Sequence, residues 1–344
     1  MTKQGIFATI NAAMKRKFWQ TLVKPSTLAF IREGRKTSGY SWFDGLHGYV
    51  YGRWPYLYIG IGTGEHRLVR TLGPVYQAIS QMVEAVSEIE ISGILGSNGP
   101  APEDRMGKQN FADSYHGKVM PLESASRLVM VNEDIRIKDL EKIIPYARAR
   151  EILLQSPDHI LALECPCRSS RPDPCLPLDV CLVIGEPFAS FVAEHHPRRS
   201  RWISQEEAVE VLRAEDQRGH VHHAFFKDAM FGRYYAICNC CSCCCGAMQA
   251  HQRGTPMLAS SGYVCEVDEA ACTGCGECSD ICQFGALSMD TYTSQVDLSR
   301  CMGCGVCVSK CEQGALALRR EASKGIPLEI SELLSTGESV LPCR

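Results

Sequence analysis

Apolar residues recur along the chain at two spacings, which predict helices in some segments and strands in others. Between residues 7 and 18 they recur every three or four positions, as on one face of a helix. The same spacing predicts a helix over residues 74–89. A longer helix is expected over 137–156, interrupted at Pro145 because proline cannot continue the helical ladder. Ser204 and Glu207 form a capping-box pattern that predicts the start of an amphipathic helix reaching Ala214.

Short apolar runs without helical spacing predict buried strands. Three of them, Ile160–Leu163, Val180–Ile184 and Tyr234–Ile237, lie close to cysteines. The glycines between residues 60 and 64 predict a turn that follows a strand. A short helix is expected at about Leu328–Leu334 in the C-terminal tail. The pattern as a whole predicts an α+β protein with a mainly helical N-terminal region.

The most regular pattern is a cysteine repeat between residues 265 and 318. The spacing C-x2-C-x2-C-x3-C occurs twice, and each position recurs after 29 residues (301 − 272). The first copy is Cys272, Cys275, Cys278 and Cys282, and the second is Cys301, Cys304, Cys307 and Cys311. This spacing is typical of bacterial iron–sulfur proteins, whereas paired zinc sites usually separate two C-x2-C units by a long gap.

The repeat, over residues of about 262–320, closely resembles the bacterial-type ferredoxin domain with two [4Fe–4S] clusters. The resemblance implies a compact α+β domain and crossed ligation. One cluster would then be bound by Cys272, Cys275, Cys278 and Cys311, and the other by Cys282, Cys301, Cys304 and Cys307. The family usually has proline after the fourth cysteine, where this chain has Gln283 and Glu312.

Ten further cysteines lie upstream of the repeat and predict a second metal-binding constellation. They are Cys165, Cys167, Cys175, Cys181, Cys238, Cys240, Cys241, Cys243, Cys244 and Cys245. Cysteines at the ends of three predicted strands can converge at one sheet edge, so we expect one or two more [4Fe–4S] clusters. A structural zinc site, a copper–thiolate cluster and redox disulfides are the alternatives. The arrangement resembles cysteine-rich modules of iron–sulfur oxidoreductase-type proteins of anaerobes.

Other residues near these cysteines have weaker predictions. The pairs His195–His196 and His222–His223 could supply nitrogen ligands, although such histidines more often only form hydrogen bonds. Cys265 and Cys343 fit no motif, and we expect no role for them.

Composition sets the broader limits. The chain has 344 residues, a net charge of −3 and 20 cysteines, none of them among the first 164 residues. The charge argues against nucleic acid as the main partner. Because the N-terminus lacks a secretory signal pattern and no apolar run reaches 18 residues, we expect a cytoplasmic protein.

The N-terminal region is basic and aromatic, with eight Lys and Arg residues up to Lys36. It is either a docking surface, for a membrane or a membrane-bound partner, or a helix packed on the protein's own core. We expect a docking region at 1–120, a cysteine-rich module at 121–260, a ferredoxin domain at 261–320 and a tail at 321–344.

These features predict an iron–sulfur electron-transfer protein, because all-cysteine cubanes exchange single electrons and leave no coordination position open. We expect it to relay low-potential electrons within a redox complex, with a flavoprotein or another iron–sulfur oxidoreductase as partner. No catalytic residue is predicted, since the sequence has no triad, phosphate loop or dinucleotide fingerprint. The alternatives are a reductase acting at a non-standard central cluster and an iron–sulfur assembly or sensing module.

Overall fold

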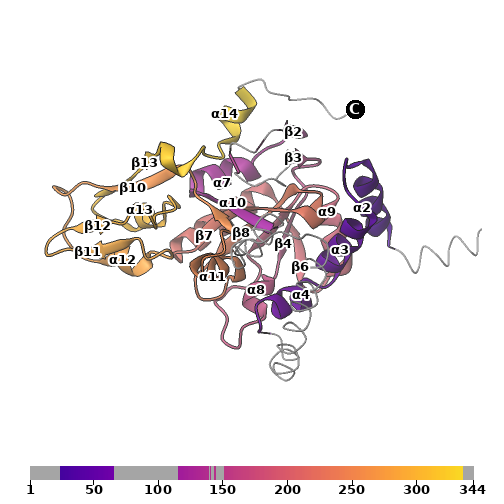
Figure 1. Ribbon diagram of the computed structural model, residues 1–344, viewed down its shortest axis with the longest axis horizontal. Helices are drawn as coiled ribbons and strands as arrows, with labels where there is room; N and C mark the ends of the chain where they lie inside the picture. Colours follow the sequence, from indigo (N-terminus) through magenta and orange to yellow (C-terminus); the bar gives the residue numbers. More distant parts are fainter. Residues whose placement is uncertain (1–23, 66–114, 139, 141–142, 145–150, 336–344) are drawn as a thin grey trace, which may run out of the picture.

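A computed structural model describes residues 24–65, 115–138, 140, 143–144 and 151–335 (Figure 1). Its largest element is a nine-stranded sheet in the middle of the chain. The strands are β1 (Tyr115–Met120), β2 (Ile135–Lys138), β3 (Glu151–Leu154), β4 (Ile160–Leu163), β5 (Cys181–Ile184), β6 (Ser200–Ile203), β7 (Val221–Lys227), β8 (Arg233–Cys240) and β9 (Leu258–Ala259). The protein is a mixed α+β structure, as the sequence pattern predicts.

The sheet is mostly antiparallel. Its main path runs β6-β4-β5-β8-β7-β1-β9, and β3 joins β2 to the side of β8. The β1–β9 and β3–β8 pairs are parallel. The order brings β4, β5 and β8 side by side, although about 50 residues separate the last two strands in the sequence.

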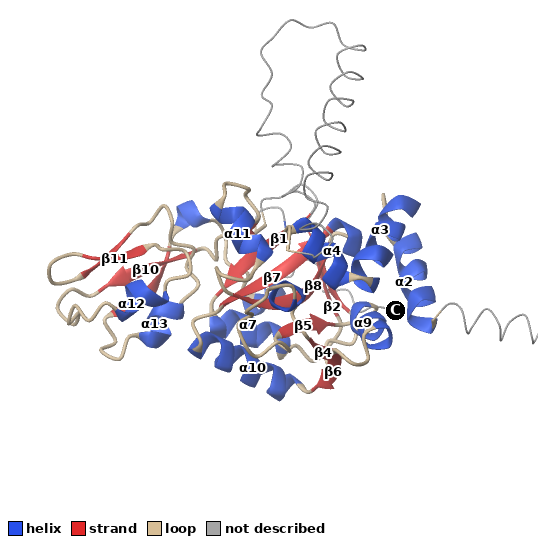
Figure 2. Cartoon of the chain, turned by 90° about the horizontal axis from the view of Figure 1, so that it is seen from below, coloured by secondary structure: helices blue, strands red, loops and turns tan. Residues whose placement is uncertain are grey.

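Both faces of the sheet are buried because successive side chains of its apolar strands point to opposite sides. In β4, Ile160 and Ala162 enter one core, whereas Leu161 and Leu163 enter the other. The first core lies under α7 (Leu122–Val129) and α10 (Gln205–Gln217). Figure 2 shows these two helices on one side of the strands.

The second core lies under four helices. They are α2 (Pro25–Lys36), α3 (Trp42–Arg53), α4 (Pro55–Gly62) and α9 (Phe188–His195). Phe30, Tyr51 and Phe191 anchor α2, α3 and α9 in this core. The N-terminal helices therefore complete the core on the sheet face that carries cysteines 165, 181 and 240.

The C-terminal cysteine repeat forms a separate group of small elements at one end of the molecule (Figure 1). Its strands and helices are β10 (Tyr263–Val267), α12 (Glu277–Ile281), β11 (Leu287–Met289), β12 (Ser294–Val296), α13 (Val306–Lys310) and β13 (Leu316–Arg320). β10 pairs with β13 and β11 pairs with β12, both antiparallel. The remaining elements are α8 (Pro166–Ser169), η2 (Asp228–Met230), α11 (Gly246–Gln252), η3 (Ala322–Lys324) and α14 (Ile330–Ser335).

Several predicted elements are confirmed. The strands expected around 160–163, 180–184 and 234–237 are β4, β5 and β8. The helix expected from Ser204 is α10, and the Ser204 hydroxyl accepts a hydrogen bond from the Glu207 backbone N–H at 3.2 Å. The short helix near the C-terminus is α14.

Two predictions are wrong, and two lie outside the described residues. Where the structure describes residues 137–156, they do not form one helix, because 137 and 138 end β2 and 151–154 form β3. The apolar side chains Ile135 and Ile137 alternate with polar ones in β2, which is the period of a strand. The glycines at 60–64 end helix α4, which begins at Pro55, a residue well suited to the first helical turn. The helices predicted over 7–18 and 74–89 are not among the described residues.

Candidate metal centres

The C-terminal repeat surrounds two small cavities with cysteine sulfurs. Cys272, Cys275 and Cys278 line the first cavity together with Cys311, which follows α13 in the second copy of the repeat. The second cavity is lined by Cys301, Cys304, Cys307 and, from the first copy, Cys282. Each cavity therefore combines three cysteines of one copy with the fourth of the other, the same two sets that the ferredoxin resemblance implies.

Glycines make the tight turns around these cavities possible. Gly274 and Gly303 occupy equivalent positions in the two copies and have φ values of 71° and 63°. A Cβ atom at Gly274 would lie 2.7 Å from the carbonyl oxygen of Tyr292, and one at Gly303 would lie 2.1 Å from that of Tyr263. Only glycine fits such close approaches in a left-handed conformation.

Backbone N–H groups point toward sulfur in the second cavity. The Cys265 N–H donates to the Cys301 Sγ at 3.4 Å, and the Ala286 N–H donates to the Cys282 Sγ at 3.3 Å. The Cys265 thiol also lines this cavity, with its Sγ 3.6 Å from that of Cys307. Hydrogen bonds to sulfur tune the reduction potential of a cluster. Cys265, for which the sequence suggested no role, is therefore part of the site.

In the central sheet, three strand ends bring the upstream cysteines together. Cys181 begins β5 and pairs with Leu163 at the end of β4, so Cys165 follows at the same edge. The end of β8 reaches this edge as well, because Ile237 pairs with Leu182. The convergence expected from the sequence is thus present.

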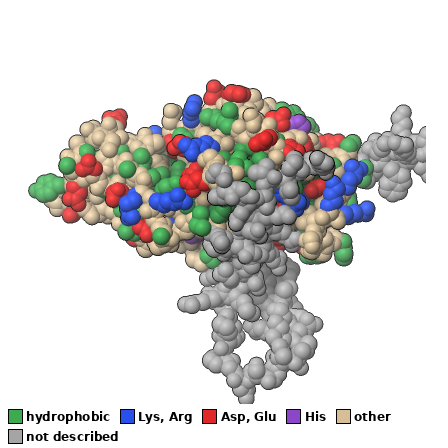
Figure 3. All heavy atoms as spheres, turned by 90° about the horizontal axis from the view of Figure 1, so that it is seen from above, with side chains coloured by type: hydrophobic (Ala, Val, Ile, Leu, Met, Phe, Trp, Pro, Cys, Tyr) green, Lys and Arg blue, Asp and Glu red, His purple; other side chains and the backbone are tan. Residues whose placement is uncertain are grey.

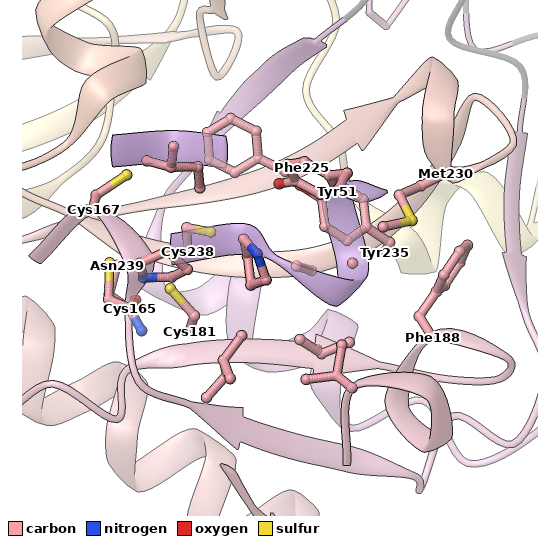
Figure 4. A pocket seen from close by; sticks show the side chains of 18 of the residues that line it. Tyr51, Cys165, Cys167, Cys181, Phe188, Phe225, Met230, Tyr235, Cys238 and Asn239 are labelled. Atoms are coloured by element: carbon pink, nitrogen blue, oxygen red, sulfur yellow. The ribbon is translucent and has the colours of Figure 1, made fainter. Parts of the chain in front are cut away.

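Six of these cysteines surround one buried cavity of about 80 Å³. Thiol contacts connect them in the order Cys238, Cys181, Cys165, Cys167, Cys245 and Cys240. Figure 4 shows the sulfurs of Cys165, Cys167, Cys181 and Cys238 at one end of the cavity, and the rings of Tyr51, Phe188 and Tyr235 toward the other. Cysteine sulfurs therefore line one end of the cavity, and aromatic rings line the other.

The hydrogen bonds inside this cavity favour one thiolate. Bonds from the thiols of Cys167 and Cys181 hold the pKa of Cys165 well below its usual range. The same bonds raise the pKa of Cys167 and of Cys181 well above it. Cys165 is the thiol most readily deprotonated for metal binding, since the thiolate is the form that binds metals.

Arg168 connects the segments that form the sulfur end of the cavity. Its side chain is 1 % exposed and forms an ion pair with Glu215 of α10, which is fully buried. It also donates to the carbonyl oxygens of Pro177 at 2.6 Å and Asn239 at 3.0 Å. Arg168 was not predicted as a site residue, and the only sequence signal was its position directly after Cys167.

The other four central cysteines form a second group beside these six thiols. They are Cys175, Cys241, Cys243 and Cys244, whose sulfur atoms all lie within 4.8 Å of one another. No disulfide joins them. Cys241 and Cys244 also line the wall of the six-thiol cavity.

The predicted histidines lie elsewhere. The rings of His195 and His196 hydrogen-bond to the carbonyl oxygens of Phe191 at 2.9 Å and Gly52 at 2.8 Å. His222 hydrogen-bonds to the Asn239 side chain at 2.6 Å. None of them, nor His223, lines a cysteine cavity described here. They are part of the packing between sheet and helices.

One side chain connects the two cysteine regions. The Ser242 backbone N–H, inside the 238–245 cysteine segment, donates to the Gln283 side-chain oxygen at 2.8 Å. Gln283 directly follows Cys282, which lines the second ferredoxin-type cavity. One of the two residues that depart from the ferredoxin pattern thus contacts the central module.

Comparison with known proteins assigns one part of the chain. No curated protein matches the chain. Among the described residues, no helix has both the length and the apolar character needed to cross a bilayer. Residues 271–315 match the family model described as a 4Fe-4S dicluster domain. This segment contains all eight cysteines of the repeat, so the chain carries a ferredoxin-type, 4Fe–4S-binding dicluster domain near its C-terminus.

Proposed function

We propose that this protein transfers single electrons between two [4Fe–4S] clusters in its dicluster domain and a third iron–sulfur centre in the six-thiol cavity. Cys272, Cys275, Cys278 and Cys311 would bind one cluster, and Cys282, Cys301, Cys304 and Cys307 the other. Clusters bound only by cysteine supply one-electron chemistry and offer no position for a substrate. The residues around them hold the sulfurs, exclude water and set the potential.

The observation that carries this proposal is the contact between Ser242 and Gln283. Cys282 lies directly before Gln283, and Ser242 lies between Cys241 and Cys243. Electron transfer slows steeply with distance, so a hydrogen bond between the two cysteine regions favours exchange between their centres. The contact holds the cysteine segment 238–245 next to the second ferredoxin-type cavity, as a relay requires.

The six-thiol cavity has the donors that a third cluster needs. Four cysteines suffice for one [4Fe–4S] cluster, so six leave a choice of ligands. The cavity is apolar apart from its sulfurs, Arg168, Asn239 and the hydroxyl groups of Tyr51 and Tyr235. Burial and low polarity disfavour added negative charge and lower a reduction potential, and the Arg168 guanidinium partly offsets this effect.

Counting iron and acid-labile sulfide in anaerobically purified protein tests the proposal. Two clusters correspond to about eight irons and three clusters to about twelve. We expect three sets of reducible signals by electron paramagnetic resonance, with electrons passing between the dicluster domain and the third centre. An iron content of about eight, with no signal beyond the dicluster pair, contradicts the third centre.

The aromatic end of the same cavity favours a second candidate function, a reductase. The hydroxyl groups of Tyr51 and Tyr235 hydrogen-bond to each other at 2.8 Å beside the sulfur-lined end (Figure 4). An apolar substrate bound there would contact both the third centre and phenolic protons. A change in the resonance signal of that centre on adding such a substrate supports this function. A signal unaffected by any of the compounds tried supports the relay.

We further propose that a redox protein, a flavoprotein or another iron–sulfur oxidoreductase, docks on the N-terminal helices. Trp42 and Phe43 of α3 are 80 % and 63 % exposed beside a groove that Lys24, Arg35 and Arg53 also line. Lys and Arg side chains gather at this end of the molecule in Figure 3. A basic rim with an aromatic centre suits an acidic partner surface. The proposed location is the cytoplasm, with possible partners at a membrane surface.

Reduction of the clusters by cell extract tests this surface. Trp42→Ser combined with Phe43→Ser is expected to slow bleaching of the cluster absorbance. Tyr292→Ser, which changes an 81 % exposed ring on the dicluster domain, is the matched control. Equal rates in all three proteins exclude α3 as the docking surface.

A further inference from the structure

The four cysteines outside the six-thiol cavity form a tight cluster of sulfur atoms. The Cys175 Sγ lies 3.2 Å from that of Cys243 and 3.7 Å from those of Cys241 and Cys244. The Sγ atoms of Cys243 and Cys244 are 3.7 Å apart. Four mutually close sulfurs from two distant segments make a compact set of donors.

These distances fit one metal ion better than a cubane. Four sulfurs about 2.3 Å from one zinc ion form a tetrahedron with edges of about 3.8 Å. In a cubane each thiolate binds a different iron, so its sulfurs lie farther apart. Elsewhere in the described part of the chain, no three potential ligand atoms of Cys, His, Asp or Glu lie as close together. The sulfur atoms of the dicluster domain therefore lie farther apart than the sulfur atoms of this group.

The surroundings of the four sulfurs hold the two segments in place. Arg171 donates to the Cys244 carbonyl oxygen at 3.2 Å and to the Gln249 side chain at 2.7 Å. Gln249 in turn donates to the Cys243 carbonyl oxygen at 2.9 Å. These bonds fix the backbone that carries the thiols and place a positive charge beside a site that would be anionic when loaded. Such outer contacts are typical of built metal sites.

We propose that Cys175, Cys241, Cys243 and Cys244 bind a single four-coordinate metal ion, of the class that zinc represents. A site with four protein thiolates is closed, which is the arrangement of structural zinc. The ion fastens the loop that carries Cys175 to the segment after β8. Because Cys241 and Cys244 also line the six-thiol cavity, the ion closes the outer wall of that cavity. This inference goes beyond the proposed electron transfer and does not depend on it.

Metal and sulfide analysis of the full-length protein, purified anaerobically, tests the proposal. We expect about one zinc ion per chain in the unchanged protein. Cys175→Ser and Cys243→Ser should each lose that ion while iron and acid-labile sulfide stay constant. Loss of one iron without sulfide also supports a single-ion site, with iron as the occupant. Cys343→Ser, which changes a cysteine of the C-terminal tail that fits no motif, is the control and should keep the ion.

Two outcomes overturn the proposal. One is a combined loss of iron and sulfide in the Cys175 and Cys243 variants, which would assign these thiols to a cluster. The other is an unchanged zinc and iron content in both variants. Should the variants fail to fold, X-ray absorption at the zinc edge of the unchanged protein decides. Four sulfur neighbours at about 2.3 Å support the site. Nitrogen neighbours contradict it, and so does protein that contains neither zinc nor iron in excess of its sulfide.

Discussion

The dicluster domain and the central module gather cysteines in opposite ways. In the dicluster domain, three sulfurs of each cavity come from seven consecutive residues, and only the fourth comes from the other copy of the repeat. In the central module, β4, β5 and β8 bring together cysteines that lie up to 80 residues apart (245 − 165). A local turn dictates the first arrangement, whereas the pairing of a large sheet dictates the second.

The two arrangements also differ in the number of cysteines that line each cavity. The first dicluster cavity has four cysteines, the number that one cluster needs. The second dicluster cavity has one more, Cys265. The central cavity has six thiols in contact with one another, and Cys241 and Cys244 also line its wall. The first dicluster cavity therefore has no spare cysteine, whereas the central cavity has at least two.

The largest expected effect tests whether the central site tolerates the loss of one cysteine better than the dicluster site does. Cys275→Ser removes one of four ligands, and we expect the loss of a whole cluster, about four irons, with its resonance signal. Cys240→Ser removes one of six, and the neighbouring thiols are expected to retain the third centre in altered form. Iron and sulfide counts on both variants measure the contrast. A central cluster lost as completely as the dicluster one would show that its six thiols are not interchangeable.

The next effect concerns stability. Arg168→Met removes the buried cation of Glu215 and leaves it with His220 and the half-exposed Arg218. We expect a loss of about 3 kcal/mol in the free energy of unfolding. Arg201→Met is the matched control. Its ion pairs with Asp179 and Glu207 are half exposed, so about 1 kcal/mol or less is expected. Denaturant unfolding under anaerobic conditions measures both. Similar losses in the two variants would exclude Arg168 as the connection between the central segments.

The same ion pair predicts a pH dependence. Burial alone would raise the pKa of Glu215, but hydrogen bonds from His220 and Arg168 and the Arg168 charge bring it below its ordinary value. A depressed carboxyl pKa stabilises the fold above the unfolded value, about 4.3, and this contribution is lost as pH falls through the folded pKa. The stability gap between Arg168→Met and the unchanged protein should therefore be widest near neutral pH and narrow on acidification. A gap that widens in acid would contradict this assignment.

The difference between local turns and strand pairing also explains which parts of these sites the sequence could predict. The eight cysteines of the repeat could be recognised from the sequence, because their spacing is set by local turns and they lie inside the segment that matches a 4Fe-4S dicluster domain. The strands β4, β5 and β8 were also predictable, since they are short apolar runs. The division of the ten central thiols into six and four was not, because it depends on side-chain directions after the strands have paired. Arg168 and Gln283 escaped prediction for the same reason, as their partners are distant in sequence.

A smaller effect is expected at the junction of the two regions. Gln283→Leu removes the hydrogen bond to the Ser242 N–H, and we expect slower electron exchange between the dicluster domain and the third centre. The cost in stability should be about 1 kcal/mol, as for an ordinary hydrogen bond. Glu312→Leu changes the equivalent, exposed position of the second repeat and serves as control. Freeze-quench resonance measurements after partial reduction compare the rates. Unchanged exchange in Gln283→Leu would show that the contact is not on the electron path.

The smallest expected effect lies within the dicluster domain and tests whether its two halves are equivalent. The Cys265 thiol lies 3.6 Å from the Cys307 Sγ in the second cavity, and no such extra thiol lines the first. The Cys307 thiol donates to Cys265 in the structure, but as a metal-bound thiolate Cys307 can only accept, so the Cys265 thiol becomes the donor. A donor to a ligand sulfur stabilises the reduced, more negative cluster, so Cys265→Ala should lower the potential of the second cluster. The first cluster should keep its potential, because Cys265 does not line its cavity. The backbone N–H of residue 265, which donates to Cys301 in the second cavity, is retained in the variant. Redox titration of the two resonance signals separates them. Equal shifts in both clusters would point to a general change in solvent exposure and not to the lost thiol.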